Sequence, residues 1–262
     1  MRGASVTLGL VCAVVYAFLL APIVVVVGAS FNSGNFLAFP PEGLSFRWYE
    51  VFFANQVFLD AIVASLQIAA IATVASGLVG TAAALYYARF AGRGREALRL
   101  AILSPLLLPE VLTAIALLFF VYEIGIGTEH QIGLVVGHVL ITLPFVFLNV
   151  AAALHGLDPG LEAAARSLGA GRWTAFFRIT LPLIKPGVIN GCLFAFIISF
   201  DTYAISFLLK GIGTSTLPLQ LLEYLRFNFT PEAAAVSTVS VVMTLIVVVA
   251  TEKFVGLKVQ RF

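Results

Sequence analysis

The sequence predicts an all-α polytopic membrane protein with six transmembrane helices. Of its 262 residues 61% are hydrophobic and only 11% are charged, whereas about a quarter of the residues are charged in an ordinary soluble domain. Apolar runs of about 20 residues, the length of a helix that crosses a bilayer, recur along the chain. These runs are continuous and do not alternate, so a transmembrane β-barrel is excluded. We expect a single domain over residues 1–262.

Six apolar segments account for the expected spans. The first is longer than the core of a secretory signal, which holds about 7–15 residues, so we interpret it as a retained span. Pro105 and Pro109 are expected to break the third span, because proline interrupts the hydrogen bonding of a helix. In chain order the expected spans are about residues 6–29, 61–87, 100–122, 132–154, 188–209 and 233–251.

Basic residues are concentrated on one side of the expected bundle. Six spans place both termini on the same side, and that side holds twelve of the fifteen Lys and Arg residues. Because cytoplasmic loops are enriched in Lys and Arg, both termini and the loop after the fourth span are expected in the cytoplasm. The residues on this side are Arg2, Arg89, Arg93, Arg95, Arg99, Arg166, Arg172, Arg178, Lys185, Lys253, Lys258 and Arg261, against Arg47, Lys210 and Arg226 on the other.

The cytoplasmic loop of residues 158–187 is expected to hold two short helices and a hinge. Asp158 is placed to cap the first helix, and Pro159 suits its first turn, where a missing N–H costs little. Gly169 is expected to end that helix in a left-handed conformation. The second helix is expected to end at Pro182. The loop is too short and too charged to span a bilayer, so we expect it to present a corner to a partner.

Motifs of common enzymes and metal sites are absent from the sequence. It contains no GxxxxGK[ST] phosphate loop, no HExxH, no CxxC and no GxSxG elbow. The three histidines are spread over an outer turn, a span and an inner turn, and His138 is expected to be a hydrogen-bonded interior group. Cys12 and Cys192 lie in apolar runs and are interpreted as small core residues. We therefore assign no catalytic residue, cofactor or metal to this chain, and its net charge of +2 gives no reason to expect nucleic acid.

Two acidic residues fall within the expected spans, Glu110 in the third and Asp201 in the fifth. A charge inside a bilayer costs about 2.5–3.5 kcal/mol on insertion scales, so both are candidates for a substrate pathway that attracts a cation. For Glu110 a structural role stays open, because an acid directly after Pro109 would stand at the positive end of a helix dipole.

Three aromatic residues complete the candidate pathway. Phe200 and Tyr203 flank Asp201 and could add cation–π contacts. Tyr224 falls in an outer loop and is a candidate for a gate or for docking of a soluble partner. Within the cytoplasmic loop, Trp173 and Phe176 are expected to anchor the loop to its own bundle.

The cytoplasmic loop resembles the signature of the inner-membrane permease subunits of binding-protein-dependent ABC importers. That signature reads EAA, three residues, Gly, nine residues, Ile, one residue, Leu-Pro. Here Gly169 is followed by nine residues and then by the sequence Ile-Thr-Leu-Pro, which ends at Pro182. The chain departs from the signature at the acid, because Ala163 occupies the glutamate position and the acid stands one residue earlier, at Glu162.

Within this family the chain is most similar to the second permease subunit of spermidine/putrescine-type transporters. The similarity includes Ser104-Pro105, Pro109-Glu110 and the stretch of residues 199–235. Thr202 stands where a second acid often follows the aspartate in that group. Related clades that carry iron, thiamine, phosphonate or opine share this scaffold, so these substrates remain alternatives to a polyamine.

The resemblance implies a type I ABC importer permease fold that forms half of a translocation pathway in the bacterial inner (plasma) membrane. The implied partners are membrane lipid, a second permease subunit in a heterodimer, a periplasmic or extracellular substrate-binding protein and two copies of a cytoplasmic ATPase. ATP and Mg would be bound by that ATPase and not by this chain. The implied ATPase-coupling residues are Glu162, Ala163, Ala164, Ala165, Arg166, Ser167, Leu168, Gly169, Ala170 and Arg172.

Two functions of other classes are alternatives to an importer permease. A self-sufficient secondary transporter or channel predicts internal repeats or several intramembrane ion ligands, and neither occurs. A membrane-embedded enzyme would need a catalytic constellation that the sequence lacks.

Overall fold

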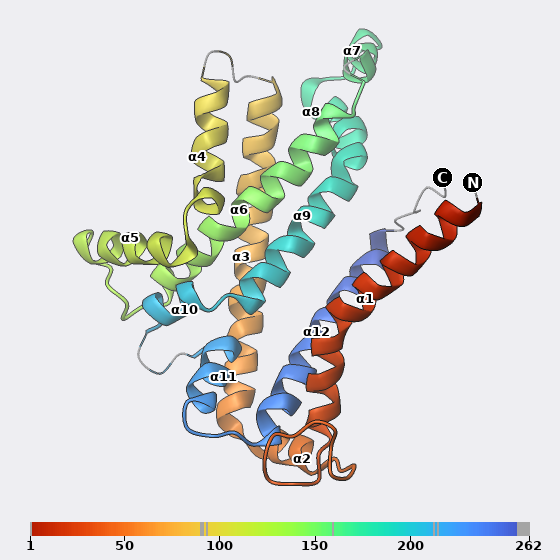
Figure 1. Cartoon of the computed structure of the whole chain (residues 1–262). Coiled ribbons are helices and arrows are strands. Elements are labelled where there is room, and N and C mark those ends of the chain that lie inside the picture. Colours follow the sequence, from red (N-terminus) through yellow and green to blue (C-terminus); the bar gives the residue numbers. More distant parts are fainter. Residues whose placement is uncertain are drawn as a thin grey trace. The chain divides into compact units, whose positions relative to one another are not determined.

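The computed structural model describes residues 2–89, 92, 94–158, 160–211, 213 and 215–255, with the side chains of residues 7–253 among them. The described chain is helical apart from turns and one β-bridge between Asn32 and Leu44. Figure 1 shows the helices, which are α1 (Arg2–Ser30), α2 (Arg47–Ala54), α3 (Gln56–Arg89), α4 (Arg95–Leu107), α5 (Glu110–Glu123), α6 (Ile132–His155), α7 (Gly160–Ser167), α8 (Arg172–Ala175), the π-helix η1 (Phe176–Thr180), α9 (Leu181–Asp201), α10 (Ala204–Leu209), α11 (Leu217–Leu225) and α12 (Pro231–Val255).

In the described part of the chain, five helices are long and apolar enough to cross a membrane, and one bent pair of helices is a sixth candidate. This agrees with the six spans predicted from the sequence. The five single spans are Thr7–Ser30, Gln56–Arg89, Ile132–His155, Arg172–Asp201 and Pro231–Lys253.

The third span is broken, as predicted, but the break occurs at one proline only. α4 and α5 meet at an angle of 107° on either side of Leu108 and Pro109. Leu108 has an extended backbone (ψ 146°), which is the conformation that a following proline imposes. Pro105 lies inside α4 and does not end it, so the predicted break of the third span is confirmed and lies at Pro109.

The fifth span has different boundaries from the predicted residues 188–209. α8, η1 and α9 form one continuous segment, Arg172–Asp201. The prediction that Pro182 ends a helix is wrong, because Pro182 stands in the first turn of α9, where its missing N–H is tolerated, and the π-helix precedes it. The segment ends at Asp201, and α10 follows after Thr202 and Tyr203.

Two short helices lie in segments that the sequence predicts as loops. α2 buries Trp48 and Phe52, which are one turn apart, and α11 buries Leu217 and Leu219. With 8 and 9 residues these helices are too short to be recognised by a search for bilayer-spanning runs.

The contacts divide the chain into two compact units, Met1–Asp60 with Gln220–Leu245 and Ala61–Leu219 with Ile246–Phe262. In the first unit α1 and α12 run side by side (Figure 1). Residues of both helices and of the segment 37–39 line an apolar cavity of about 360 Å³. Buried Asn32 holds the loop before α2, since its side chain bonds the carbonyl of Phe36 and the N–H of Glu42, each at 2.9 Å. The prediction of one domain over residues 1–262 stays a prediction.

Two apolar clusters form the interior of the second unit. One joins α3, α5, α6 and α10 and includes Leu134 and Ile205, and the other joins α3, α6 and α9 around Val146, Phe147 and Ile184. The packing between α6 and α9 is close enough that a Cβ added to Gly191 would lie 2.7 Å from the Cα of Val146. These clusters fix the helices that carry the candidate site.

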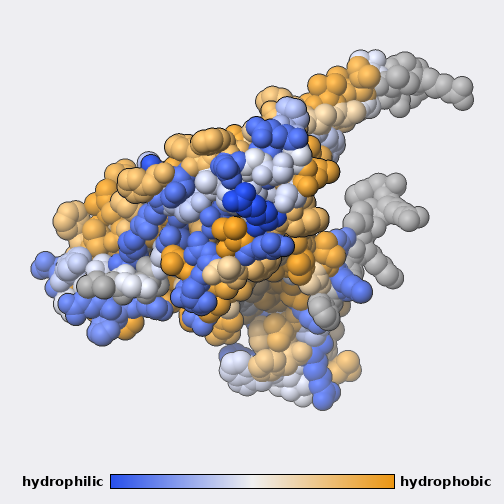
Figure 2. Space-filling view, turned by 90° about the horizontal axis from the view of Figure 1, so that it is seen from below, coloured by the Kyte–Doolittle hydropathy of each residue, from blue (hydrophilic) through white to orange (hydrophobic). Residues whose placement is uncertain are grey.

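Hydrophobic residues also cover much of the surface (Figure 2). Phe18 is 77% exposed in α1, and Leu78 and Phe119 are each 71% exposed in α3 and α5. Such exposure on long helices is expected where lipid tails, and not water, surround the protein.

Candidate functional site

The cytoplasmic loop of residues 158–187 begins with α7, which is capped at its N-terminal end. The Oδ1 atom of Asp158 accepts a hydrogen bond from the N–H of Gly160 at 2.8 Å. A side-chain oxygen at this place satisfies one of the N–H groups that have no partner within the helix. The predicted cap is confirmed, while Pro159, predicted for the first turn, lies outside the described residues.

The C-terminal end of α7 is a Schellman motif. Gly169 has a φ of +90°, and its N–H donates to the carbonyl of Arg166 at 3.0 Å. The N–H of Ala170 donates to the carbonyl of Ala165, also at 3.0 Å. These two bonds and the left-handed glycine define the motif and confirm the predicted end at Gly169.

The corner between α7 and α8 projects from the chain. Leu168 is 89% exposed, and α7 has no buried residue. The prediction that Trp173 anchors the loop to the bundle is wrong, because Trp173 is 75% exposed and stacks on Phe177, while Ala175 is the buried residue of α8. Phe176, predicted for the same role, is half-buried and packs edge-on against Trp173. Most of the predicted coupling residues border a shallow hollow at this corner, which is lined by Ala163, Arg166, Ser167, Gly169, Ala170, Gly171 and Arg172.

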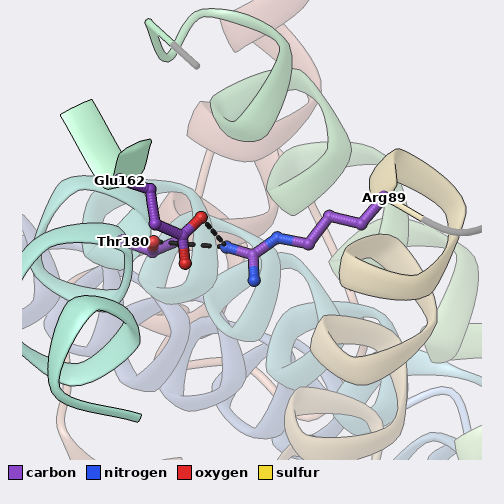
Figure 3. A network of polar contacts seen from close by, with 3 residues as sticks. All are labelled: Arg89, Glu162 and Thr180. Atoms are coloured by element: carbon purple, nitrogen blue, oxygen red, sulfur yellow. Dashed lines mark hydrogen bonds and ion pairs between the residues drawn. The ribbon is translucent and has the colours of Figure 1, made fainter. Parts of the chain in front are cut away.

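A polar cluster ties α7 to two other elements (Figure 3). The Nη2 atom of Arg89, the last residue of α3, lies 2.9 Å from the Oε2 atom of Glu162 and donates to the Oγ1 atom of Thr180 at 3.2 Å. Sequence reasoning counted Arg89 only as one charge of a basic turn and missed this cluster. Two features of the sequence could have indicated the cluster. One is an arginine at the end of a span, and the other is an acid that stands one residue before the glutamate position of the signature.

The two intramembrane acids come together where two helices are interrupted. Glu110 is the first residue of α5, and Asp201 is the last residue of α9. The hydroxyl of Thr202 donates a hydrogen bond to the Glu110 carboxylate, and Asp201 is close enough to interact electrostatically with Glu110. Glu110 thus stands in the first turn of α5, as the structural alternative predicted, and both acids are exposed on this chain.

His138 is a hydrogen-bonded interior group, as predicted. Its side chain is fully buried, with Nδ1 2.8 Å from the hydroxyl oxygen of Ser199 in α9 and Nε2 3.2 Å from that of Ser206 in α10. Ser206 also donates to the backbone carbonyl of Thr202 at 3.3 Å. A search of the described residues finds no group of three His, Cys, Asp or Glu side chains that could hold a metal ion.

The predicted aromatic residues lie in different surroundings. Phe200 is buried and stacks on Phe196, whereas Tyr203 is half-buried and stacks on Phe207. Within this chain the ring of Tyr203 thus stays partly accessible, and that of Phe200 is covered by neighbouring side chains. No described contact tests the cation–π role predicted for either residue.

Tyr224 belongs to a half-buried polar group of the first unit. Its hydroxyl donates to Glu232 at 2.7 Å and lies 2.6 Å from the hydroxyl oxygen of Thr230, while Asn55 donates to the other carboxylate oxygen of Glu232 at 3.0 Å. Burial raises the pKa of the Tyr224 phenol, so the hydroxyl stays protonated and able to donate. These contacts hold the turn between α11 and α12.

The family described as binding-protein-dependent transport system inner membrane component matches residues 76–256. The chain belongs to this family. It is therefore an inner-membrane permease subunit of an ABC importer. Because the chain belongs to this family, a permease subunit is favoured over the alternatives of a secondary transporter, a channel or an enzyme.

Curated relatives and solved structures agree with this family. The chain is 34% identical to the spermidine/putrescine transport system permease protein PotC of Haemophilus influenzae, over 91% of this chain and 92% of the relative. It is 35% identical to the putrescine transport system permease protein PotI of Escherichia coli, over 85% and 81%. A chain from the crystal structure of a bacterial ABC transporter that imports alginate superimposes with a TM-score of 0.75 at 17% identity, over 99% of this chain and 97% of that one. The last likeness establishes the fold alone.

Proposed function

We propose that this permease subunit couples ATP hydrolysis by a cytoplasmic ATPase to passage of a polyamine through the membrane. The observation that carries the proposal is the corner between α7 and α8, where α7 is capped at both ends and has no buried residue, and where Leu168 is almost fully exposed. A small, rigid corner of this kind suits docking in a groove of a partner. Arg166 and Arg172 beside its hollow can pair with acidic groups there.

The assembly that we propose contains two permease subunits, this chain and a second, different one. Two ATPase subunits bind ATP and Mg beneath them, and a soluble binding protein delivers the substrate to the outer face. Hydrolysis would take place on the ATPase, so this chain would transmit motion and take no part in the chemistry.

A cationic substrate is supported by the two acids that meet at the breaks of α4–α5 and α9–α10. Glu110 and Asp201 both remain exposed on the chain, and paired carboxylates attract an amine that carries several positive charges. Relatives named for spermidine and putrescine transport point to the same class. Iron, thiamine, phosphonate and opine remain the alternatives to test.

The coupling proposal is tested in the assembled transporter in liposomes by measuring substrate taken up per ATP hydrolysed. Gly169→Pro cannot adopt the φ of +90° and removes an N–H of the Schellman motif, and Ala164→Trp places a bulky group on exposed α7. We expect either change to lower the ratio about tenfold, which is a usual size for coupling between sites. Gly94→Ala, in the turn before α4 and outside the corner, is the matched control, because its φ is −86° and no atom lies within 4 Å of the added Cβ. Wild-type ratios in both variants would contradict the proposal.

The substrate is tested separately, by ATP hydrolysis of the same assembly with its binding protein. The binding protein is supplied with spermidine, putrescine, an opine or a phosphonate in turn. We expect stimulation by a polyamine. Stimulation by another compound only would refute the polyamine and leave the coupling role standing.

A further inference from the structure

Arg89 brings together three elements that are far apart in the sequence. It ends α3, while Glu162 lies in the first turn of α7 and Thr180 ends the π-helix η1. One guanidinium nitrogen, Nη2, serves both partners, at 2.9 Å from Glu162 and 3.2 Å from Thr180 (Figure 3). The cluster therefore connects α7 with the end of α3 and with the π-helix inside the fifth span.

The charges of the cluster suit the helices that carry them. An arginine at the C-terminal end of α3 and a glutamate at the N-terminal end of α7 both interact favourably with the helix dipoles. The two charged side chains are only 31% and 30% exposed, and Thr180 is buried. A charge-assisted pair with this degree of shielding is less screened than a pair fully in water.

The position of Glu162 explains the departure from the family signature. Ala163 occupies the glutamate position of the signature and is exposed beside the hollow of the corner. Since each residue of an α-helix is turned by about 100° from the previous one, an acid at position 162 points to a different face of α7 from an acid at 163. That face is the one turned toward Arg89. Glu162 is the single acidic residue of α7, so the helix presents no carboxylate on the side of the hollow.

We propose that Glu162 is a positioning residue, which acts through Arg89 to hold α7 on the end of α3 and on the π-helix. The corner, the end of α3 and the π-helix then move together when an ATPase displaces the corner. The inference rests on the proposed function of α7 as the coupling helix. It assigns Glu162 to the interior of this chain and leaves the face with Ala163 and Arg166 for the ATPase.

The test uses four variants of the full chain in the assembled transporter. Glu162→Gln and Arg89→Gln each remove one charge of the pair, and the exchanged pair Arg89→Glu/Glu162→Arg restores attraction in the opposite sense. The matched control is Glu96→Gln, which removes the acid of an exposed pair with Arg99 that is 3.7 Å long. All are compared with wild type for insertion and for recovery of the complex.

Two readouts distinguish positioning from simple stability. The first is the stimulation of ATP hydrolysis by the binding protein, which we expect to fall about threefold in each single variant, as suits an ion pair with about a third of its surface exposed. We expect partial recovery in the exchanged pair, because its two charges attract each other but oppose the helix dipoles. The second is deuterium uptake by residues 160–168, measured in the complex without nucleotide. We expect this uptake to rise in the single variants and to fall back toward the wild-type level in the exchanged pair. Glu96→Gln should change neither readout.

Three results would overturn the inference. Wild-type behaviour of both single variants would show that the pair positions nothing. Loss in the single variants with no recovery at all in the exchange would show that attraction between these two side chains is not what positions α7. If the ATPase no longer co-purifies with the Glu162→Gln variant but still co-purifies with Arg89→Gln, Glu162 belongs directly to the ATPase interface. If Gly169→Pro also takes up substrate at the wild-type ratio to ATP hydrolysed, the proposed function itself fails. If Gly169→Pro lowers that ratio while the single variants are normal, only the positioning role of Glu162 fails.

Discussion

His138 illustrates how single polar residues are placed inside this apolar chain. Its ring nitrogens contact Ser199 and Ser206, which lie on either side of the interruption between α9 and α10. The ring thereby connects α6 with both halves of the broken segment. Since no water reaches such a position, each buried polar group depends on these partners.

Replacing His138 with leucine should destabilise the chain. The substitution leaves the hydroxyls of Ser199 and Ser206 without their imidazole partner, and we expect a loss of about 1–3 kcal/mol. The measurement is reversible unfolding in detergent micelles. His130→Leu, at an exposed position, should stay within about 0.5 kcal/mol of wild type. Equal stability of the two variants would contradict the role given to His138.

Glu110 offers a second test at the scale of one side chain. Glu110→Gln keeps the shape of the side chain and removes its charge, so we expect transport of a polyamine to fall about tenfold, equivalent to about 1.4 kcal/mol. Glu123→Gln, at the exposed far end of the same helix, is the control. Uptake of radiolabelled putrescine by liposomes measures both. If both variants transport alike, the carboxylate of Glu110 does not attract the substrate.

At the scale of elements, the contact between α6 and α9 depends on glycine. A Cβ at Gly187 would lie 2.7 Å from the Cβ of Ala153 and 2.9 Å from the carbonyl oxygen of Asn149, and a Cβ at Gly191 would meet the backbone of Val146. Gly187 and Gly191 are four residues apart, so they form the GxxxG pattern that lets membrane helices approach closely.

Widening this contact should separate the two helices. We expect Gly191→Val to cost about 1–3 kcal/mol, because the backbone of Val146 cannot move aside without displacing α6. The midpoint of thermal unfolding in detergent is the measurement. Gly9→Val is the control, since no atom lies within 4 Å of a Cβ at Gly9. A Gly191 variant that unfolds at the wild-type temperature would show that the contact is not close-packed in the protein.

The sequence predicts the long elements and the caps well, because these depend on local composition. Continuous apolar runs identify the spans, and Asp158 and Gly169 mark the two ends of α7 in the structure as they do in the sequence. The continuation through Pro182 could not be foreseen, because it depends on a π-helix that has no sequence signal of its own. The interruption after Asp201 contains neither glycine nor proline, so only tertiary contacts such as those of His138 explain it.

The candidate site was predictable in parts only. The acids Glu110 and Asp201 stand out because charge is rare in a span, but their meeting depends on two helix interruptions, one of them without a sequence signal. The ion pair of Arg89 and Glu162 joins residues 73 positions apart (162 − 89), and no local pattern connects them. Long-range contacts of this kind require the structure.

At the scale of the whole molecule, the distribution of charge predicts the orientation in the membrane. The test places single cysteines at exposed Ser33 and Ser167 in a background in which Cys12 and Cys192, both free, are replaced by serine. We expect a membrane-impermeant maleimide to label Ser33→Cys in intact cells, and Ser167→Cys only after the membrane is opened. Labelling of Ser167→Cys in intact cells would place the corner of α7 and α8 outside and exclude an ATPase as its partner.

Docking of the corner on an ATPase is tested most directly by a photo-crosslinker placed at Leu168, which is 89% exposed. A second chain carries the same crosslinker at Phe36, which is 78% exposed and predicted on the opposite side of the membrane. After illumination of the assembled transporter, we expect the Leu168 position to form an adduct with the ATP-binding subunit and the Phe36 position to form none. Absence of that adduct at Leu168, or equal adducts at both positions, would contradict the coupling role of this loop.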